Sequence, residues 1–215
     1  ADRSPADPAA LALARRISRG ADSDEAKARK LYYWVLENIE NNNNVFGIAP
    51  AMLSGRTGNR TRVLHYLLGL VGVRSSLVLV RDYSADQTES ELADDDTYGN
   101  LVLKLGDRYL VTGARGIPFG YISPMMRGQD ALVLLPYERS NEVREVTLPE
   151  APEGSEKRSI EILADVASDG SARVEVTETF RGLQAIEWRT DLEGVPEAVL
   201  EERFEEGYAA RVIPG

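Results

Sequence analysis

The feature that most constrains the fold is a change of hydrophobic period at Gly72. Before it, residues 59–71 carry apolar side chains at helical spacing over a wide face, which predicts a largely buried helix. After it, residues 76–80 read Ser-Leu-Val-Leu-Val, a short apolar run rich in β-branched residues, which predicts a strand. We therefore expect a fold in which helices pack on a sheet.

The other segments extend this pattern. Gly106-Asp107 is a two-residue link between two apolar runs, which is typical of a tight hairpin. The spacing predicts an α+β domain whose helices pack on an antiparallel sheet. We expect helices over 8–19, 23–41 and 59–71, with one short turn near 51–53, and strands over 75–81, 100–105, 108–112 and 130–135.

The character of the chain changes again near Gly154. Residues 159–166 and 172–179 alternate around Ser168-Asp169-Gly170, which predicts a hairpin, and residues 196–206 have the pattern of an amphipathic helix. We expect two domains, 1–145 and a β-rich segment 146–215. We also expect the second to be truncated, because the chain reads as a fragment of a longer protein.

Composition excludes several classes of site. The 215 residues include no cysteine and one histidine, so thiol nucleophiles, Cys-based metal sites and disulfides are ruled out. The net charge of −10 argues against a nucleic-acid partner. Asp94-Asp95-Asp96 lacks the spacing of a calcium loop and is expected to be a solvated loop. We predict no metal and no cofactor.

One segment carries a family resemblance. Residues 53–73 read LSGRTGNRTRVLHYLLGLVGV, a Gly-flanked loop followed by a buried helix and a Gly-Val ending. This segment resembles the core of the transglutaminase-like superfamily, which has a papain-like arrangement. The runs that begin at Tyr98 and Tyr109 look like the strands that carry the family's histidine and aspartate. The resemblance implies a bacterial, extracytoplasmic parent protein in which a β-rich domain follows.

The family's chemistry uses a thiolate at a helix N-terminus, an imidazole beside it and a carboxylate that orients the imidazole. Aligned through Gly72, the cysteine position falls on Thr57, whereas a register fixed on Gly58-Asn59 places it on Arg60. The histidine position falls on Asn100 and the aspartate position on Thr112. The resemblance therefore implies a degenerate triad and no catalytic residue.

His65 and the residues around the expected helix start are two further candidates for a functional role. His65 lies eight residues beyond Thr57, roughly 12 Å along a helix, so we expect it to pack or to face solvent rather than to act as a base. Arg56, Asn59 and Arg60 surround the expected helix start, where they could form an anion or ligand cleft. The alternative is that these arginines pair with the acidic loop 82–96.

We expect a catalytically inactive transglutaminase-like domain that acts as a binding or structural module, in the periplasm or elsewhere outside the cytoplasm. A thiol-independent hydrolase or amidase that uses the same cleft is one alternative. A peptide-binding module is another. A protein or peptide partner fits these readings. Nucleic acid does not, and no segment is apolar enough to span a membrane.

Overall fold

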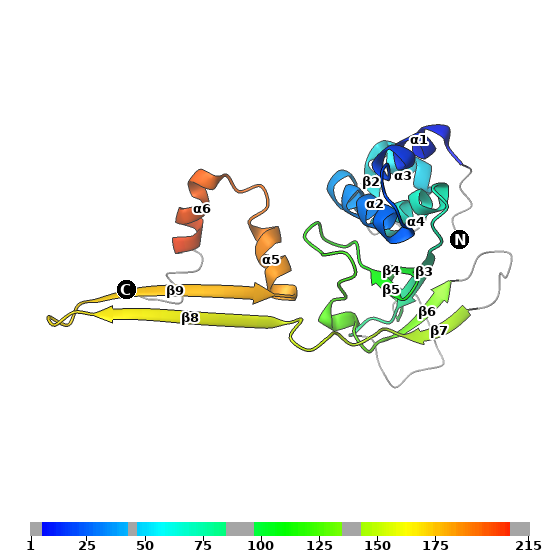
Figure 1. Cartoon of the computed structure of the whole chain (residues 1–215). Helices are drawn as coiled ribbons and strands as arrows, with labels where there is room; N and C mark the ends of the chain where they lie inside the picture. Colours follow the sequence, from blue (N-terminus) through cyan, green and yellow to red (C-terminus); the bar gives the residue numbers. More distant parts are fainter. Residues whose placement is uncertain (1–5, 43–46, 85–96, 135–142, 207–215) are drawn as a thin grey trace. The chain divides into compact units, whose positions relative to one another are not determined.

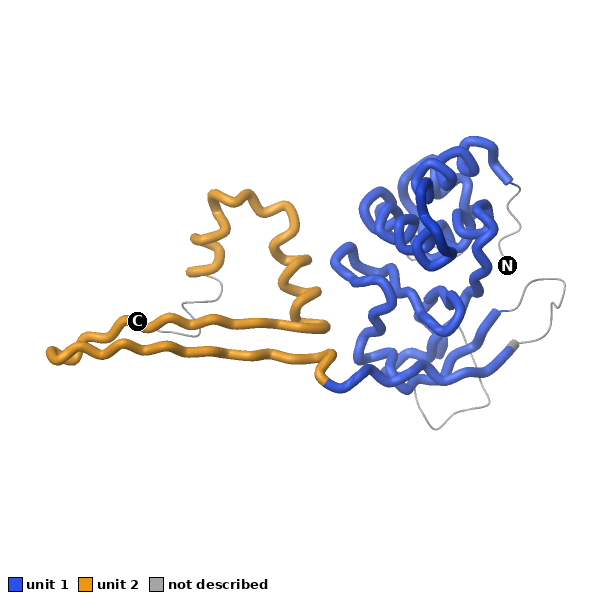
Figure 2. Tube along the Cα trace, viewed as in Figure 1, with its two compact units in different colours: residues 1–153 blue, residues 154–215 orange. Residues whose placement is uncertain are grey.

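The computed structural model describes residues 6–42, 47–84, 97–134 and 143–206. The chain divides into two compact units, residues 1–153 and 154–215 (Figure 2). This division lies eight residues beyond the expected 145/146 boundary. The reason is that strand β7 (Val143–Thr147) pairs along its whole length with β6 (Asp130–Leu134) and so belongs to the first unit.

The three predicted helices of the first unit are confirmed. They are α1 (Pro8–Ile17), α2 (Asp24–Asn38) and α4 (Arg60–Leu70). Each begins after a polar residue whose side chain accepts a hydrogen bond from a first-turn N–H group, namely Asp7, Ser23 and Asn59. A further helix, α3 (Ala49–Gly55), lies where the sequence indicated only a short turn.

The first unit contains a five-stranded antiparallel sheet, as the sequence predicted for four of its strands (Figure 1). Its order is β5-β4-β3-β6-β7, so β3 lies at the centre and β7 adds an edge strand. The Gly106-Asp107 link joins β4 and β5 as a hairpin, with Gly106 at φ 56°. The remaining bounds are Ser76–Val80 for β3, Asn100–Leu105 for β4 and Arg108–Leu110 for β5.

Both faces of this sheet are covered. Leu77, Leu103 and Leu110 pack in one buried cluster with residues of the helices. Val78, Val102 and other side chains of the opposite face form a second cluster with Ile117, Ile122 and Met126, which belong to the irregular segment between β5 and β6. The alternation along each strand therefore supplies two separate cores.

A two-residue parallel pairing, which the sequence did not predict, joins distant parts of the chain. β1 (Glu40–Asn41) follows α2, and β2 (Thr57–Gly58) directly precedes α4. Gly58 has φ 150°, and a Cβ there would clash with Cγ of Met52, so the close approach of α3 requires glycine. This pairing fixes the segment from which α4 begins.

The second unit contains the predicted hairpin and helix. β8 (Lys157–Val166) pairs with β9 (Ala172–Arg181), and α6 (Glu197–Phe204) corresponds to the expected amphipathic helix. A helix not predicted, α5 (Leu183–Asp191), follows β9. Trp188 of α5 stacks on Phe180, with ring centroids 5.9 Å apart, and both residues are half-buried.

Candidate functional site

The start of α4 is the region where the sequence placed the degenerate site. Asn59 is the N-cap, and its Oδ1 accepts from the backbone N–H of Arg62 at 3.1 Å. The N–H of Arg60 donates to Oδ1 of Asn41, which belongs to β1, at 3.3 Å. Side chains of the protein thus occupy two of the N–H groups that a helix N-terminus would otherwise offer to a ligand.

Arg60 fills the space beside this helix start. Its side chain is buried, with the residue 4% exposed. Nε donates to the carbonyl oxygen of Ile39 at 2.7 Å, and Nη1 donates to those of Thr112 and Gly113 at 3.3 and 3.4 Å. The guanidinium therefore connects the end of α2 to the chain that follows β5, with main-chain oxygens as the acceptors of Nε and Nη1.

A buried pair of hydroxyl groups lies beside Arg60. Oγ1 of Thr61 is 2.8 Å from Oγ1 of Thr112, and Thr61 also donates to the carbonyl oxygen of Leu101 at 3.1 Å. Because a hydroxyl has a single proton, Thr112 is then the donor within the pair. Both threonines are buried, so the pair bridges α4 to β4 and to the chain after β5 without contact with solvent.

The three predicted triad positions have separate partners. Thr57 is exposed in β2, and its Oγ1 accepts from Nδ2 of Asn42 at 3.2 Å. Nδ2 of Asn100 donates to Oδ2 of Asp82 at 3.2 Å, and Thr112 binds Thr61. Within the described residues, no hydrogen bond joins any two of the three positions.

Asp82 is the carboxylate to which Asn100 donates a hydrogen bond. The side chain and backbone of Ser84 donate to Asp82, at 2.7 and 2.9 Å, and these bonds hold the pKa of Asp82 below its usual range, with a smaller contribution from Asn100. The group is solvated, so the arrangement stabilises a local turn. The rest of the acidic loop, including Asp94-Asp95-Asp96, lies outside the described residues, and so does its predicted pairing with the arginines.

The three residues of the expected anion cleft, Arg56, Asn59 and Arg60, each bind another group of the protein. Arg56 is exposed in the left-handed region at φ 52°, and its Nη1 donates to Oδ1 of Asn38 at 3.2 Å. Asn59 caps α4, and the guanidinium of Arg60 binds carbonyl oxygens. All three residues therefore have partners within the protein.

Tyr32 is a buried residue of this region whose role the sequence did not indicate. Its hydroxyl lies 2.6 Å from the carbonyl oxygen of Val111 and 3.0 Å from that of Ile117. Burial raises the pKa of Tyr32, the neighbouring Tyr33 adds to this, and Arg60 opposes it. Tyr32 and Arg60 therefore both donate to main-chain carbonyls of the segment after β5.

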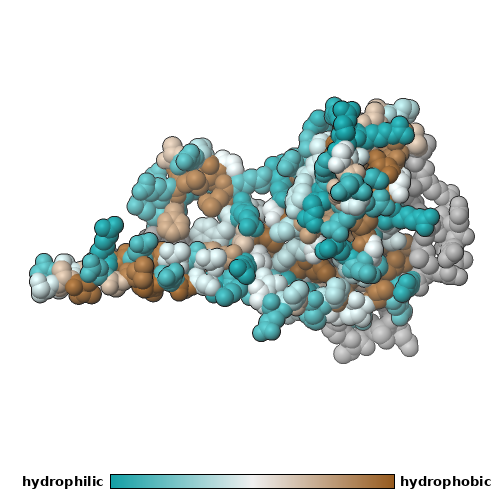
Figure 3. All heavy atoms as spheres, in the orientation of Figure 1, coloured by the Kyte–Doolittle hydropathy of each residue, from teal (hydrophilic) through white to brown (hydrophobic). Residues whose placement is uncertain are grey.

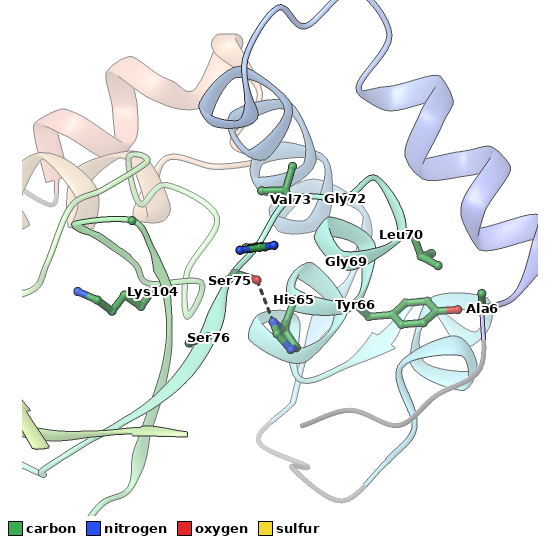
Figure 4. Close-up of a pocket in the computed structure, with 12 residues that line it drawn as sticks. Ala6, His65, Tyr66, Gly69, Leu70, Gly72, Val73, Ser75, Ser76 and Lys104 are labelled. Atoms are coloured by element: carbon green, nitrogen blue, oxygen red, sulfur yellow. Dashed lines mark hydrogen bonds between the residues drawn. The ribbon is translucent and has the colours of Figure 1, made fainter. Parts of the chain in front are cut away.

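Thr61, like Tyr32, was not singled out by the sequence, because its partner lies 51 residues away. His65 does not belong to this cluster. Its Nδ1 is 2.9 Å from Oγ of Ser75, at the wall of a separate cavity (Figure 4).

Among the described residues, no group of three or more His, Asp or Glu side chains could hold a metal ion. None of the described helices is long and apolar enough to cross a bilayer.

Comparison with known proteins gives a likeness of fold. No family model and no curated protein sequence matches the chain. Among solved structures, the chain is similar to a "putative protease" from Parabacteroides distasonis, with a TM-score of 0.50 and 12% identity. The match covers 74% of this chain and 34% of that longer one. The α+β arrangement of helices on an antiparallel sheet is therefore shared with a known structure.

Proposed function

We propose that residues 1–153 form a catalytically inactive transglutaminase-like domain that acts as a binding or structural module. In this proposal the domain belongs to a larger bacterial protein outside the cytoplasm. The order of elements supports it: helices, a Gly-flanked loop, the buried helix α4 and then an antiparallel sheet. The similarity to a chain described as a protease is compatible with a papain-like arrangement, since such a likeness concerns the fold.

The observation that carries the proposal is how the start of α4 is filled. In the resemblance, this is where a thiolate, an imidazole and a carboxylate would meet. Here the guanidinium of Arg60 binds three main-chain carbonyls, and Thr61 binds Thr112. A nucleophile needs an adjacent base and an approachable carbonyl site. The groups found here are buried, and their hydrogen-bond partners are main-chain carbonyls or, for the two threonines, each other.

Thr57 does not provide a substitute nucleophile. A threonine hydroxyl attacks only when a base takes its proton. The hydrogen-bond partner that the structure gives to Thr57 is the amide of Asn42, which donates to the hydroxyl and accepts no proton from it. The arrangement therefore supports a scaffold role rather than acyl transfer.

An activity assay tests this proposal. The purified chain is incubated with a glutamine-containing peptide and a primary amine, and ammonia release and amine incorporation are measured. We expect no turnover above the protein-free blank for the wild type, for Thr57→Ala or for the control Thr147→Ala on the edge strand β7. Turnover that Thr57→Ala abolishes and Thr147→Ala preserves would refute the proposal in favour of a thiol-independent amidase.

A further inference from the structure

A cavity of about 740 Å³ lies at the opposite end of α4 from the filled site (Figure 4). The last turns of α4, the connection to β3 and the β4–β5 hairpin at Gly106 line it. Its polar lining residues include His65, Arg74 and Ser75, and its apolar ones include Leu70 and Val73. The volume falls within the range of small-molecule sites, about 300–1,000 Å³.

Glycines keep this cavity wide. Gly69, Gly72 and Gly106 all line it, and a Cβ built at any of them would meet no atom within 4 Å. Gly72 and Gly106 have positive φ angles of 78° and 56°, which glycine adopts readily. Gly69 lies within α4, where residues other than glycine can adopt the helical conformation. The absence of a side chain at this position therefore serves only to leave space in the cavity.

The lining has a positive character in a chain of net charge −10. Among the described residues that line the cavity, none is an aspartate or a glutamate. Nζ of Lys104 donates to the hydroxyl of Tyr109 at 3.1 Å, and Figure 4 shows the Lys104 side chain directed away from His65. Arg74 and His65 are therefore the basic residues that remain to interact across the cavity.

Arg74 is exposed, and no carboxylate oxygen of a described residue lies within ion-pair distance of it. It also borders an adjoining cavity of about 620 Å³, whose lining includes Asp24, Glu25 and Asp107. Those carboxylates would compete with a bound anion for the Arg74 guanidinium, and the Asp107→Asn variant described below measures that competition.

His65 and Ser75 provide a fixed polar wall. The 2.9 Å hydrogen bond between Nδ1 and Oγ joins α4 to the end of the connection, directly before β3, and holds the imidazole at the cavity (Figure 4). An arginine with nearby hydroxyl and imidazole groups is suited to a carboxylate, which accepts charge-assisted hydrogen bonds. Leu70 and Val73 offer apolar surface to the remainder of a ligand.

We propose that this cavity binds a small organic carboxylate with a short apolar chain. Arg74 holds the carboxylate, and Ser75 donates its single proton to it while accepting from the Nδ1–H of His65. Leu70 and Val73 contact the chain. The proposal does not depend on the transglutaminase-like assignment, since none of these residues belongs to the start of α4.

Because His65 is the single histidine, its ring resonances in NMR spectra report on this cavity without ambiguity. We would titrate the full chain with hexanoate, hexanol, hexylammonium and inorganic phosphate. We expect saturable shifts with hexanoate and a Kd at least about fivefold lower than that of hexanol, since a charge-assisted bond adds roughly 1 kcal/mol or more. Equal binding of hexanol, tighter binding of phosphate, or no saturation with hexanoate would overturn the proposal.

Two variants locate the binding. Gly69→Leu fills the cavity and should abolish the hexanoate shifts while circular dichroism stays native, because leucine favours helix over glycine. Arg74→Gln should raise the Kd for hexanoate at least about fivefold. The matched control Arg144→Gln, on the exposed edge strand β7, should leave the Kd unchanged. Asp107→Asn should leave it unchanged or lower it. Wild-type affinity in Gly69→Leu or Arg74→Gln would contradict the proposed site.

Discussion

The sheet of the first unit and the hairpin of the second have similar sequence patterns but opposite burial. In both, apolar residues alternate along antiparallel strands. In the first unit the central residues Val78 and Leu103 are fully buried, because helices cover one face and the segment after β5 covers the other. In the hairpin, Ile162 is 62% exposed and Val174 is 54% exposed.

The register of the hairpin shows which of these apolar side chains lie on the same face. Ile162 pairs with Val176, and Ala164 pairs with Val174, so their side chains share one face, while the other face carries mainly charged and hydroxyl side chains together with Leu163. Apolar side chains along the hairpin are visible at the surface in Figure 3. Alternation therefore orients apolar side chains to one face of a sheet, whereas a second layer of structure is needed to bury that face.

The largest expected effect comes from matched leucine truncations in the two units. Leu103→Ala removes a side chain with 0% exposure and should lower the free energy of unfolding by about 2–5 kcal/mol, because it leaves a cavity. Leu163→Ala, at 59% exposure in β8, should change it by less than about 0.5 kcal/mol. Urea unfolding followed by circular dichroism measures both. Equal losses would mean that β8 is buried in solution.

Hydrogen exchange compares the same two regions without mutation. Amides of the central strand β3 should exchange at least about 100-fold more slowly than those of β8 and β9, since local opening is easiest where few apolar contacts are buried. Mass spectrometry of peptic peptides, or NMR, measures the rates. Protection in β9 that equals protection in β3 would show that the hairpin is covered by something in solution.

Arg60 and Arg56 form the next comparison, between a buried and an exposed arginine near the same loop. Arg60→Met removes donors from three carbonyl oxygens and should cost about 1–3 kcal/mol, because buried acceptors lose their partners. Arg56→Met removes a surface hydrogen bond to Asn38 and should cost less than about 0.5 kcal/mol. If Arg60→Met were neutral in urea unfolding, a structural role for the guanidinium would be wrong.

Tyr32 predicts a smaller, pH-dependent effect within the first unit. Its pKa is raised in the folded chain, so the folded state binds its proton more tightly than the unfolded state. The resulting stability is complete below about pH 10 and decreases as the pH rises towards the folded pKa, by at most about 1.4 kcal/mol per pH unit. Stability curves from pH 9 to pH 11 should therefore be steeper for the wild type than for Tyr32→Phe. Parallel curves would exclude this contribution.

Local patterns predicted most of the elements but few of the contacts at the candidate site. α4 was predictable because its apolar residues recur at helical spacing, and the β4–β5 hairpin because Gly106 allows a tight turn. α3 and the pairing of β1 with β2 were not, because they depend on Met52 packing against Gly58 and on strands 17 residues apart. The side chains of Arg60 and Thr61 carry no local sign that both of them bind Thr112.

The sequence by itself determined that no thiol chemistry can occur in this chain, since composition needs no coordinates. It also predicted α1, α2, α4, the strands β3 to β6 and the α+β class, because period and turn residues act over a few positions. Only the tertiary structure decided that Arg60 occupies the start of α4 and that His65 borders a separate cavity. Those outcomes depend on which distant carbonyls, hydroxyls and glycines the packing of α4 against the sheet brings together.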